Sequence, residues 1–157
     1  MTEKEIKFFD TNIDRKSSIS DKNLVFFKDT NIPMPSVIEI SNSGMCNRKC
    51  SFCPRSDPNY DHVNEFIDQN LHDKIYDELK SFNYSGSIIY SGFVEPLLDK
   101  RIYKHIKDIR EKLPNVNLEI ITNGDPLNDK RALKLFEAGI SVLLISVYDG
   151  PKEAESF

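Results

Sequence analysis

From Ser36 onward, short apolar runs alternate with longer segments in which apolar residues recur every three or four positions. Short runs rich in β-branched residues predict buried strands, and the longer periodicity predicts amphipathic helices. Strands are expected at residues 37–40, 87–90, 118–121 and 142–145, with a helix in each gap. A strand, helix, strand order favours parallel pairing with right-handed crossovers. The sequence therefore predicts an α/β fold whose parallel sheet forms part of a barrel or an open sheet.

Each of the three expected helices has its own signature. The first has an apolar stripe made of Ile67, Leu71, Ile75 and Leu79. The second ends before Pro114, and its inner face is made of Ile102, Ile106, Ile109 and Leu113. The third has an N-cap at Asn128 and a C-terminal stop at Gly139.

Residues 1–35 form a polar lead-in segment, so the folded domain is expected at residues 36–157. The lead-in contains one strand-like run, Leu24–Phe27, which is closed by Pro33 and Pro35. In parallel α/β folds, the loops after the carboxyl ends of the strands carry the functional site. The segment that follows each expected strand is therefore where functional residues are expected.

Three cysteines follow the first expected strand in a C-x-x-x-C-x-x-C arrangement, as Cys46, Cys50 and Cys53, and the chain has no other cysteine. Three thiolates can bind three irons of a [4Fe-4S] cluster and leave the fourth iron open, whereas an electron-carrying ferredoxin normally uses four. A structural zinc site needs four ligands, and only His62 is near. An odd cysteine count after a polar N-terminus does not fit a secreted disulfide framework. The spacing favours an iron–sulfur cluster, with zinc binding or incidental thiols as alternatives.

With Phe52 directly before the third cysteine, this motif resembles the signature of the radical S-adenosylmethionine (SAM) superfamily. The resemblance implies that SAM chelates the open iron through its amino and carboxylate groups. Electron transfer from the reduced cluster then splits SAM into methionine and a 5′-deoxyadenosyl radical, which abstracts hydrogen from a substrate. It also implies a reductant protein, such as a flavodoxin or ferredoxin, and a position for Phe52 against the adenine.

The ends of the later strands resemble the same family. Ser91–Leu98 is similar to its G-G-E-P motif, with Val94 where glycine is usual. Residues 122–124 (Thr-Asn-Gly) are similar to its T-N-G tip, and residues 146–150 are similar to its S-x-D-G tip. Each motif taken singly is more common as a turn. Together, the resemblance implies SAM contacts from Gly92, Glu95, Pro96, Thr122 and Ser146.

Composition narrows the remaining function classes. The chain is 39% hydrophobic, with no apolar run near the ~20 residues that a membrane span needs. A net charge of −4 argues against a nucleic-acid surface. The cysteine loop carries Arg48, Lys49 and Arg55, which either form a solvated loop or offset the negative charge of a cluster and steer anionic partners. Reduced thiols and an oxygen-sensitive cluster are typical of a reducing cytoplasm.

Barrels of the resembled family are typically built from about six βα units, whereas this chain supplies four strands and three helices. We therefore expect a core domain that is truncated at its C-terminus. The alternative is a short protein whose sheet is completed by a partner. In either case, strand 142–145 would be an apolar sheet edge of the kind that proteins normally cover.

The leading functional hypothesis is a radical SAM enzyme, or the N-terminal part of one. The alternative is a non-catalytic iron–sulfur or metal-binding electron-transfer module. The strand-end residues discriminate between them, because an electron carrier does not need Gly92, Glu95, Thr122 or Ser146. The sequence does not specify a substrate or a reaction type. Residues 60–62 and Tyr148 could face a substrate, but no residue is assigned a catalytic role.

Overall fold

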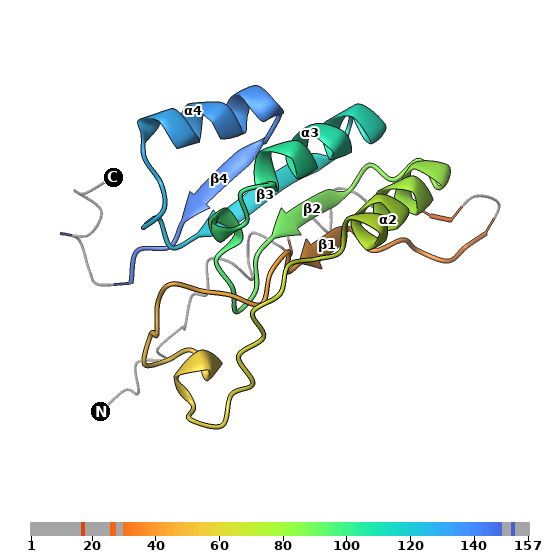
Figure 1. Cartoon of the computed structure of the whole chain (residues 1–157). Helices are drawn as coiled ribbons and strands as arrows, with labels where there is room; N and C mark the ends of the chain where they lie inside the picture. Colours follow the sequence, from red (N-terminus) through yellow and green to blue (C-terminus); the bar gives the residue numbers. More distant parts are fainter. Residues whose placement is uncertain (1–16, 18–25, 28–29, 149–151, 153–157) are drawn as a thin grey trace, which may run out of the picture.

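A computed structural model describes residue 17, residues 26–27, residues 30–148 and residue 152, and its centre is a four-stranded parallel sheet. The strands lie in chain order: β1 (Val37–Ile40), β2 (Ser87–Tyr90), β3 (Asn117–Thr122) and β4 (Val142–Ile145). Three helices connect them and cover one face of the sheet (Figure 1): α2 (Gln69–Ser81), α3 (Ile102–Lys112) and α4 (Asp129–Ala138). The predicted α/β fold, with four parallel strands and three helices of a partial barrel, is confirmed.

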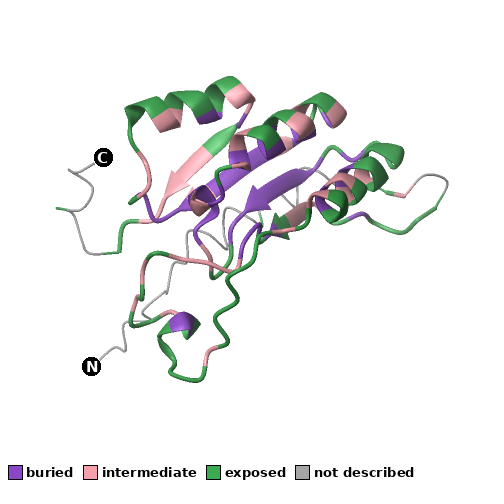
Figure 2. Ribbon diagram, viewed as in Figure 1, coloured by how far each residue is buried: buried purple, intermediate pink, exposed green. Residues whose placement is uncertain are grey.

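The strand register assigns the two faces of the sheet. One row across the sheet consists of Ile40, Tyr90, Ile120 and Leu143. This row belongs to the apolar core between the sheet and the helices, which Figure 2 shows as buried ribbon in the middle strands and the inner helix faces. Successive strand side chains alternate between faces, so the neighbouring residues Glu39, Ile89 and Glu119 point to the face without helices.

Helix α3 confirms its predicted inner face. Ile102, Ile106 and Ile109 are completely buried, and Leu113 directly after the helix is 3% exposed. The strict spacing of these residues sets one apolar stripe against the sheet.

For helix α2 the predicted stripe is wrong at Leu71, which is 50% exposed. The side chain of Asp68 caps the helix by accepting hydrogen bonds from the backbone N–H groups of Asn70 and Leu71. Two polar aromatic residues, His72 and Tyr76, take the buried face instead.

Both buried side chains of α2 reach the hydroxyl of Tyr90 on β2. The Nε2 atom of His72 lies 3.0 Å from Tyr90 Oη, and the Tyr76 hydroxyl lies 3.1 Å from the same atom. Because these polar atoms satisfy one another, the two rings can be buried at small cost in lost hydrogen bonds. Hydropathy periodicity cannot detect such a pairing, and this is why the sequence pointed to Leu71.

Helix α4 has the predicted ends. The side chain of Asn128 accepts a hydrogen bond of 3.0 Å from the backbone N–H of Arg131, and Gly139 ends the helix with φ 107° in the left-handed region. Glycine takes this conformation without the steric cost that a side chain would add. After it, β4 forms an edge of the described sheet, and Val142 is 37% exposed.

The strand-like run expected at Leu24–Phe27 lies partly outside the described residues. Within them, Phe26 pairs with Pro33 in an isolated antiparallel bridge. No helix in the described part of the chain is both long enough and apolar enough to cross a membrane.

Candidate functional site

The cysteines lie on a long loop between β1 and α2, at the carboxyl ends of the strands (Figure 1). The base of this loop is closed by backbone hydrogen bonds, from Gly44 N to Glu65 O at 2.8 Å and from Ile67 N to Asn42 O at 2.9 Å. Another bond, from Glu95 N to Met45 O at 2.7 Å, ties the loop to the segment after β2. The start of the loop is therefore held against the sheet before the first cysteine.

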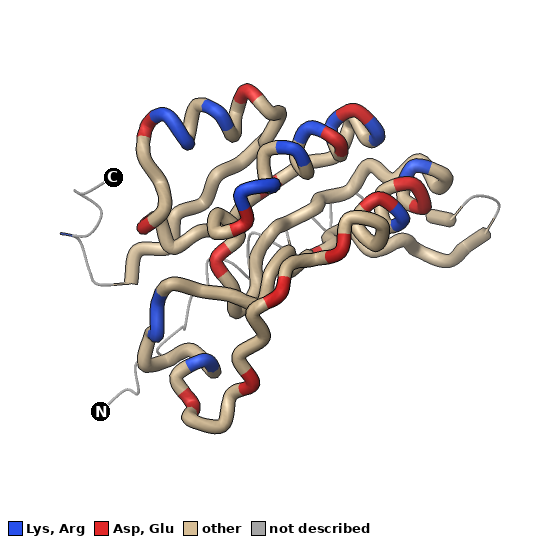
Figure 3. The backbone as a smooth tube through the Cα atoms, viewed as in Figure 1, with Lys and Arg blue, Asp and Glu red and all other residues tan. Residues whose placement is uncertain are grey.

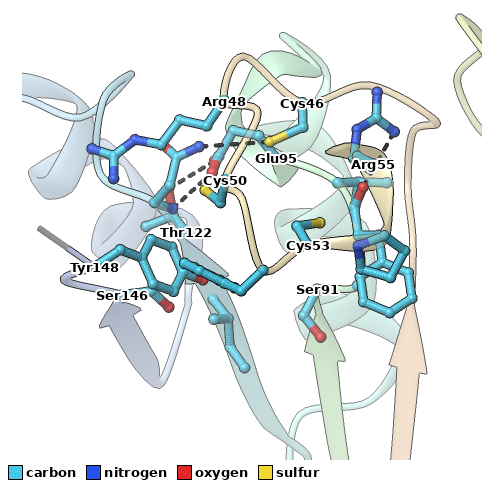
Figure 4. Close-up of a pocket in the computed structure, with 17 residues that line it drawn as sticks. Cys46, Arg48, Cys50, Cys53, Arg55, Ser91, Glu95, Thr122, Ser146 and Tyr148 are labelled. Atoms are coloured by element: carbon cyan, nitrogen blue, oxygen red, sulfur yellow. Dashed lines mark hydrogen bonds between the residues drawn. The ribbon is translucent and has the colours of Figure 1, made fainter. Parts of the chain in front are cut away.

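A pocket of about 240 Å³ opens between this loop and the strand ends (Figure 4). Its lining includes most of the residues that the sequence singled out: Cys46, Cys50, Cys53, Phe52, Gly92, Glu95, Thr122 and Ser146. Pro96 is the exception, since it is buried in the short 3-10 helix η2 (Pro96–Leu98) and does not line the pocket. The fold thus brings together residues from the loops that follow all four strands.

The three thiols provide a donor set of one chemical kind. Each cysteine is partly exposed and lines the pocket. Thiols spread around one pocket suit an iron–sulfur cluster better than zinc, because each thiolate of a cluster binds its own iron. The residues present therefore fit an iron–sulfur cluster.

Glu95 is a buried side chain of the pocket that accepts three hydrogen bonds. It is 1% exposed, and its Oε1 atom accepts hydrogen bonds from Leu97 N (3.0 Å) and from the Thr122 hydroxyl (2.7 Å). Its Oε2 atom accepts one from Asn123 N (2.8 Å). Burial raises the pKa of the Glu95 carboxyl, and the three donors act in the opposite direction. The carboxylate thereby joins the loop after β2 to the end of β3.

Thr122 also has its hydroxyl engaged inside the protein. In addition to donating to Glu95, the oxygen accepts a hydrogen bond from Gly124 N at 3.1 Å. Ser146 lies beside it, because its backbone N–H donates to Thr122 O at 2.8 Å and extends the pairing of β3 with β4. The individual SAM contacts predicted for Glu95, Thr122 and Ser146 stay predictions.

Gly92 has a structural reason to be glycine. Its φ is +117°, and a Cβ atom built there would lie 2.3 Å from Ser41 Oγ. Any side chain would therefore strain the backbone and clash with the end of β1. Val94, which stands where the family motif usually has glycine, lines the same pocket.

Sequence reasoning missed the link between the cysteine loop and the end of β3. The Nδ2 atom of Asn123 donates one hydrogen bond to Cys46 Sγ at 3.8 Å and another to Asn47 Oδ1 at 2.8 Å. Asp125 accepts from Asn47 Nδ2 at 2.7 Å and forms an ion pair with Arg48, which lowers the pKa of the Asp125 carboxyl. The signal available in the sequence was the polar run that directly follows an expected strand.

An aromatic pair forms another side of the pocket. Phe52 is 67% exposed, and its ring centroid lies 5.0 Å from that of Tyr148, which follows β4. Figure 4 shows Tyr148 beside Ser146 at the same side of the pocket. Phe52 is therefore placed at the pocket mouth by contact with the last strand as well as by its own loop. The last two residues of the predicted S-x-D-G tip, at 149 and 150, lie outside the described residues.

The family model described as the Radical SAM superfamily matches residues 40–155. This match covers the cysteine loop and all four strand ends. The chain belongs to the radical SAM superfamily. The family uses a [4Fe-4S] cluster and SAM, so the predicted cofactors are confirmed at the level of the family.

Relatives with known names cover a similar part of the chain. The S-adenosyl-L-methionine-dependent 2-deoxy-scyllo-inosamine dehydrogenase of Niallia circulans is 32% identical over 117 residues, which are 74% of this chain and 46% of the relative. The crystal structure of BtrN in complex with AdoMet and 2-DOIA matches with a TM-score of 0.69 at 31% identity, over 74% of this chain and 47% of that chain.

A second BtrN structure, of the selenomethionine protein in an open conformation, matches with a TM-score of 0.66 at 30% identity. It covers 75% of this chain and 52% of that chain. The chain therefore spans about half the length of the relatives it matches.

Proposed function

We propose that this chain carries the cofactor-binding part of a radical SAM enzyme, with Cys46, Cys50 and Cys53 as the ligands of a [4Fe-4S] cluster that leaves one iron for SAM. The observation that carries the proposal is the shared pocket, which is lined by all three thiols and by residues from the ends of β2, β3 and β4. When bound and reduced, the cluster with SAM supplies a 5′-deoxyadenosyl radical for hydrogen abstraction from a substrate.

The protein's own contribution is to hold the polar groups of the pocket in fixed directions. Glu95 cannot rotate without breaking hydrogen bonds to Leu97, Thr122 and Asn123. A fixed, buried carboxylate is suited to bind an ammonium group, because charge-assisted hydrogen bonds are stronger than neutral ones. We therefore assign Glu95 to bind the SAM amino group. Gly92, Thr122 and Ser146 form the polar rim of the pocket around that group. Pro96 supports this arrangement from η2 without facing the pocket.

Phe52 and Tyr148 supply the apolar side. Their rings are in contact at the pocket mouth, where a flat apolar surface suits the adenine of SAM. An electron-transfer module would need neither this surface nor the polar rim, which favours the enzyme over the carrier. We place the protein in a reducing cytoplasm, with a small reductant protein such as a flavodoxin or ferredoxin as its electron donor.

For the substrate, we propose a small molecule that bears hydroxyl groups. The support is the Niallia circulans relative, which is named as a dehydrogenase of 2-deoxy-scyllo-inosamine. A deuterated sample of that compound is the first probe to use. Hydrogen abstraction would move deuterium into 5′-deoxyadenosine, which mass spectrometry detects. Release of 5′-deoxyadenosine without deuterium would exclude 2-deoxy-scyllo-inosamine as the substrate while leaving SAM cleavage intact.

The experiment that tests the core of the proposal is anaerobic reconstitution with iron and sulfide. We expect about four irons per chain, because three thiolates with one open iron is the arrangement of this cluster type. Replacing each cysteine in turn, as in Cys46→Ala, should abolish cluster binding. Ser51→Ala is the matched control, since Ser51 is an exposed residue between two of the cysteines.

SAM binding is measured on the same samples. Addition of SAM should change the paramagnetic resonance spectrum of the reduced wild-type cluster, and reductant should then release 5′-deoxyadenosine. A colourless protein that prefers one zinc ion would contradict the cluster. An intact cluster whose spectrum ignores SAM would support the electron-transfer module.

A further inference from the structure

The three basic residues near the cysteines have different surroundings. Lys49 is exposed to solvent, and Arg48 forms an ion pair with the carboxylate of Asp125. Arg55 is 6% exposed, and within the described part of the chain it has no ion pair with a carboxylate. Figure 3 shows that the loop between β1 and α2 carries both basic and acidic positions. Arg55 is therefore the buried positive charge of this loop.

The contacts of Arg55 are with two backbone carbonyl groups and two aromatic side chains. Its Nη1 atom donates to Gly44 O at 2.7 Å and to Phe93 O at 3.3 Å, and its Nη2 atom lies 3.2 Å from Nδ1 of His62. The guanidinium also lies over the ring of Tyr60, 5.3 Å from the centroid. These contacts hold the guanidinium between the start of the cysteine loop, the loop after β2 and the segment that leads to α2.

Arg55 also belongs to the wall of the cofactor pocket. It lies in the short 3-10 helix η1 (Pro54–Ser56), which begins directly after Cys53, and it lines the pocket together with all three cysteines (Figure 4). A guanidinium keeps its charge at every accessible pH. A buried charge without an opposite charge costs free energy unless an anion compensates it. The pocket is the side from which such an anion would come.

On the basis of the proposed function, we propose that Arg55 balances the negative charge of the thiolate-bound cluster and raises its reduction potential. Reduction adds one negative charge to the cluster, and a nearby positive charge stabilises that state. Net charge and hydrogen bonding are among the factors that set the potentials of iron–sulfur clusters. The buried position makes the effect larger than that of Lys49, whose charge is screened by solvent and salt. Arg55 thus acts as a positioning and electrostatic residue, through space rather than as a ligand.

The first test compares Arg55→Gln, which removes the charge, with Arg55→Lys, which keeps it but cannot bridge the two carbonyl groups. Lys49→Gln removes an exposed charge beside Cys50 and serves as the control. Each protein is reconstituted anaerobically, its iron is counted, and its midpoint potential is measured by a redox titration followed by paramagnetic resonance. For Arg55→Gln we expect the ratio of reduced to oxidised cluster at a fixed potential to fall about tenfold, which is ~59 mV for one electron. Arg55→Lys and Lys49→Gln should stay within about threefold of the wild type, which the same relation converts to ~28 mV.

A second pair of variants leaves Arg55 in place. His62 is exposed and contacts the guanidinium, so His62→Asp should place a carboxylate next to it, whereas His62→Asn should not. We expect His62→Asp to lower the potential in the same direction as Arg55→Gln, and His62→Asn to match the wild type. Equal potentials in this pair would count against the proposal even where Arg55→Gln fails to fold or to retain iron.

Equal potentials in His62→Asp and His62→Asn, or a wild-type potential in iron-loaded Arg55→Gln, would overturn the role of Arg55. An equal shift in Arg55→Lys and Arg55→Gln would assign the effect to loop positioning instead of charge. A wild-type protein that takes up no iron would contradict the proposed function itself, independently of Arg55.

Discussion

Two regions of the molecule each bury a polar side chain, a carboxylate in the pocket and an imidazole under the helices. Glu95, at the carboxyl ends of the strands, is 1% exposed and accepts three hydrogen bonds. His105, under the helices, is fully buried, and neither of its ring nitrogens has a hydrogen bond to a described residue. His105 packs against His72 instead, with ring centroids 3.9 Å apart and ring planes tilted by 40°. The pocket thus fixes the direction of its buried polar group. The helix-covered face uses an imidazole as a flat ring that fills space.

Burial shifts the pKa values of the two regions in opposite directions. It raises the pKa of Glu95 in the pocket and lowers the pKa values of the histidines under the helices. Burial, and next the proximity of His105, lowers the pKa of His72 to about 4, and burial also lowers the pKa of His105. Asp99 lies 3.6 Å from His105 Nε2 and acts in the opposite direction, but its carboxylate is also bonded to Arg101. Both histidines are therefore neutral at neutral pH. The helix-covered face therefore supplies stability, and the pocket supplies site geometry.

The largest expected effect is in the core of the helix-covered face. Ile106 on α3 is completely buried, so Ile106→Ala should lower the free energy of unfolding by about 2–5 kcal/mol through lost burial and a cavity. Urea denaturation followed by circular dichroism measures this. Leu133→Ala is the control, since Leu133 on α4 is 64% exposed and should change stability by no more than about 0.5 kcal/mol.

Iron binding by the same variants shows whether the two regions are separate. At a temperature where Ile106→Ala is still folded, its iron content after reconstitution should equal that of the wild type. If folded Ile106→Ala loses iron as fully as a cysteine variant does, the division between a stabilising face and a site-forming end is wrong.

The next effect is the pH dependence of stability. The pKa of His72 is about 4 in the folded state and about 6.5 in the unfolded state, so the unfolded chain takes up the proton first as the pH falls. The free energy of unfolding should therefore be full above pH 6.5 and decline between pH 6.5 and pH 4. Crossing the whole window should cost on the order of 3 kcal/mol.

Variants at two histidines make this prediction specific. His105→Phe keeps a ring against His72 and removes one of the two titrating groups, so the decline between pH 6.5 and 4 should become smaller. His62→Asn, which changes an exposed histidine outside this pair, is the control variant. Urea midpoints measured across the pH range provide the comparison. A flat wild-type profile over this window would show that the buried pair does not limit stability.

Much of the fold could be predicted because its signals are local. The spacing of Ile102, Ile106 and Ile109 defined the buried face of α3, and Asn128 and Gly139 marked the ends of α4. Helix α2 was harder. His72 and Tyr76 score as polar along the chain, and their burial depends on the hydroxyl of Tyr90, which belongs to another element.

The same limit applies to the site. Cys46, Cys50 and Cys53 were found because their spacing is local, and the strand-end residues were found because each follows a strand. The hydrogen bond from Asn123 to Cys46 and the ion pair of Arg48 with Asp125 each join residues 77 positions apart. Such contacts depend on strand order and register. A single sequence shows neither, so these partners had to come from the structure.

Substitutions in the pocket should lower the free energy of unfolding less than Ile106→Ala or the drop in pH does. They should, however, change SAM binding the most. Glu95→Gln keeps the shape of the side chain, but its NH2 group replaces one oxygen and faces donors there, either Asn123 N or the pair Leu97 N and Thr122 Oγ1. Leaving buried donors unsatisfied should lower the free energy of unfolding by about 1–3 kcal/mol. Thr122→Val removes one of these donors and should cost less, about 0.5–1.5 kcal/mol, while Thr122→Ser keeps the hydroxyl and is the matched control.

On reconstituted protein, Glu95→Gln and Thr122→Val should weaken the response of the cluster's paramagnetic resonance spectrum to SAM, and Ile106→Ala should not. If Glu95→Gln responded to SAM like the wild type although it was less stable, the carboxylate would be a structural link between strand ends and not part of the SAM site.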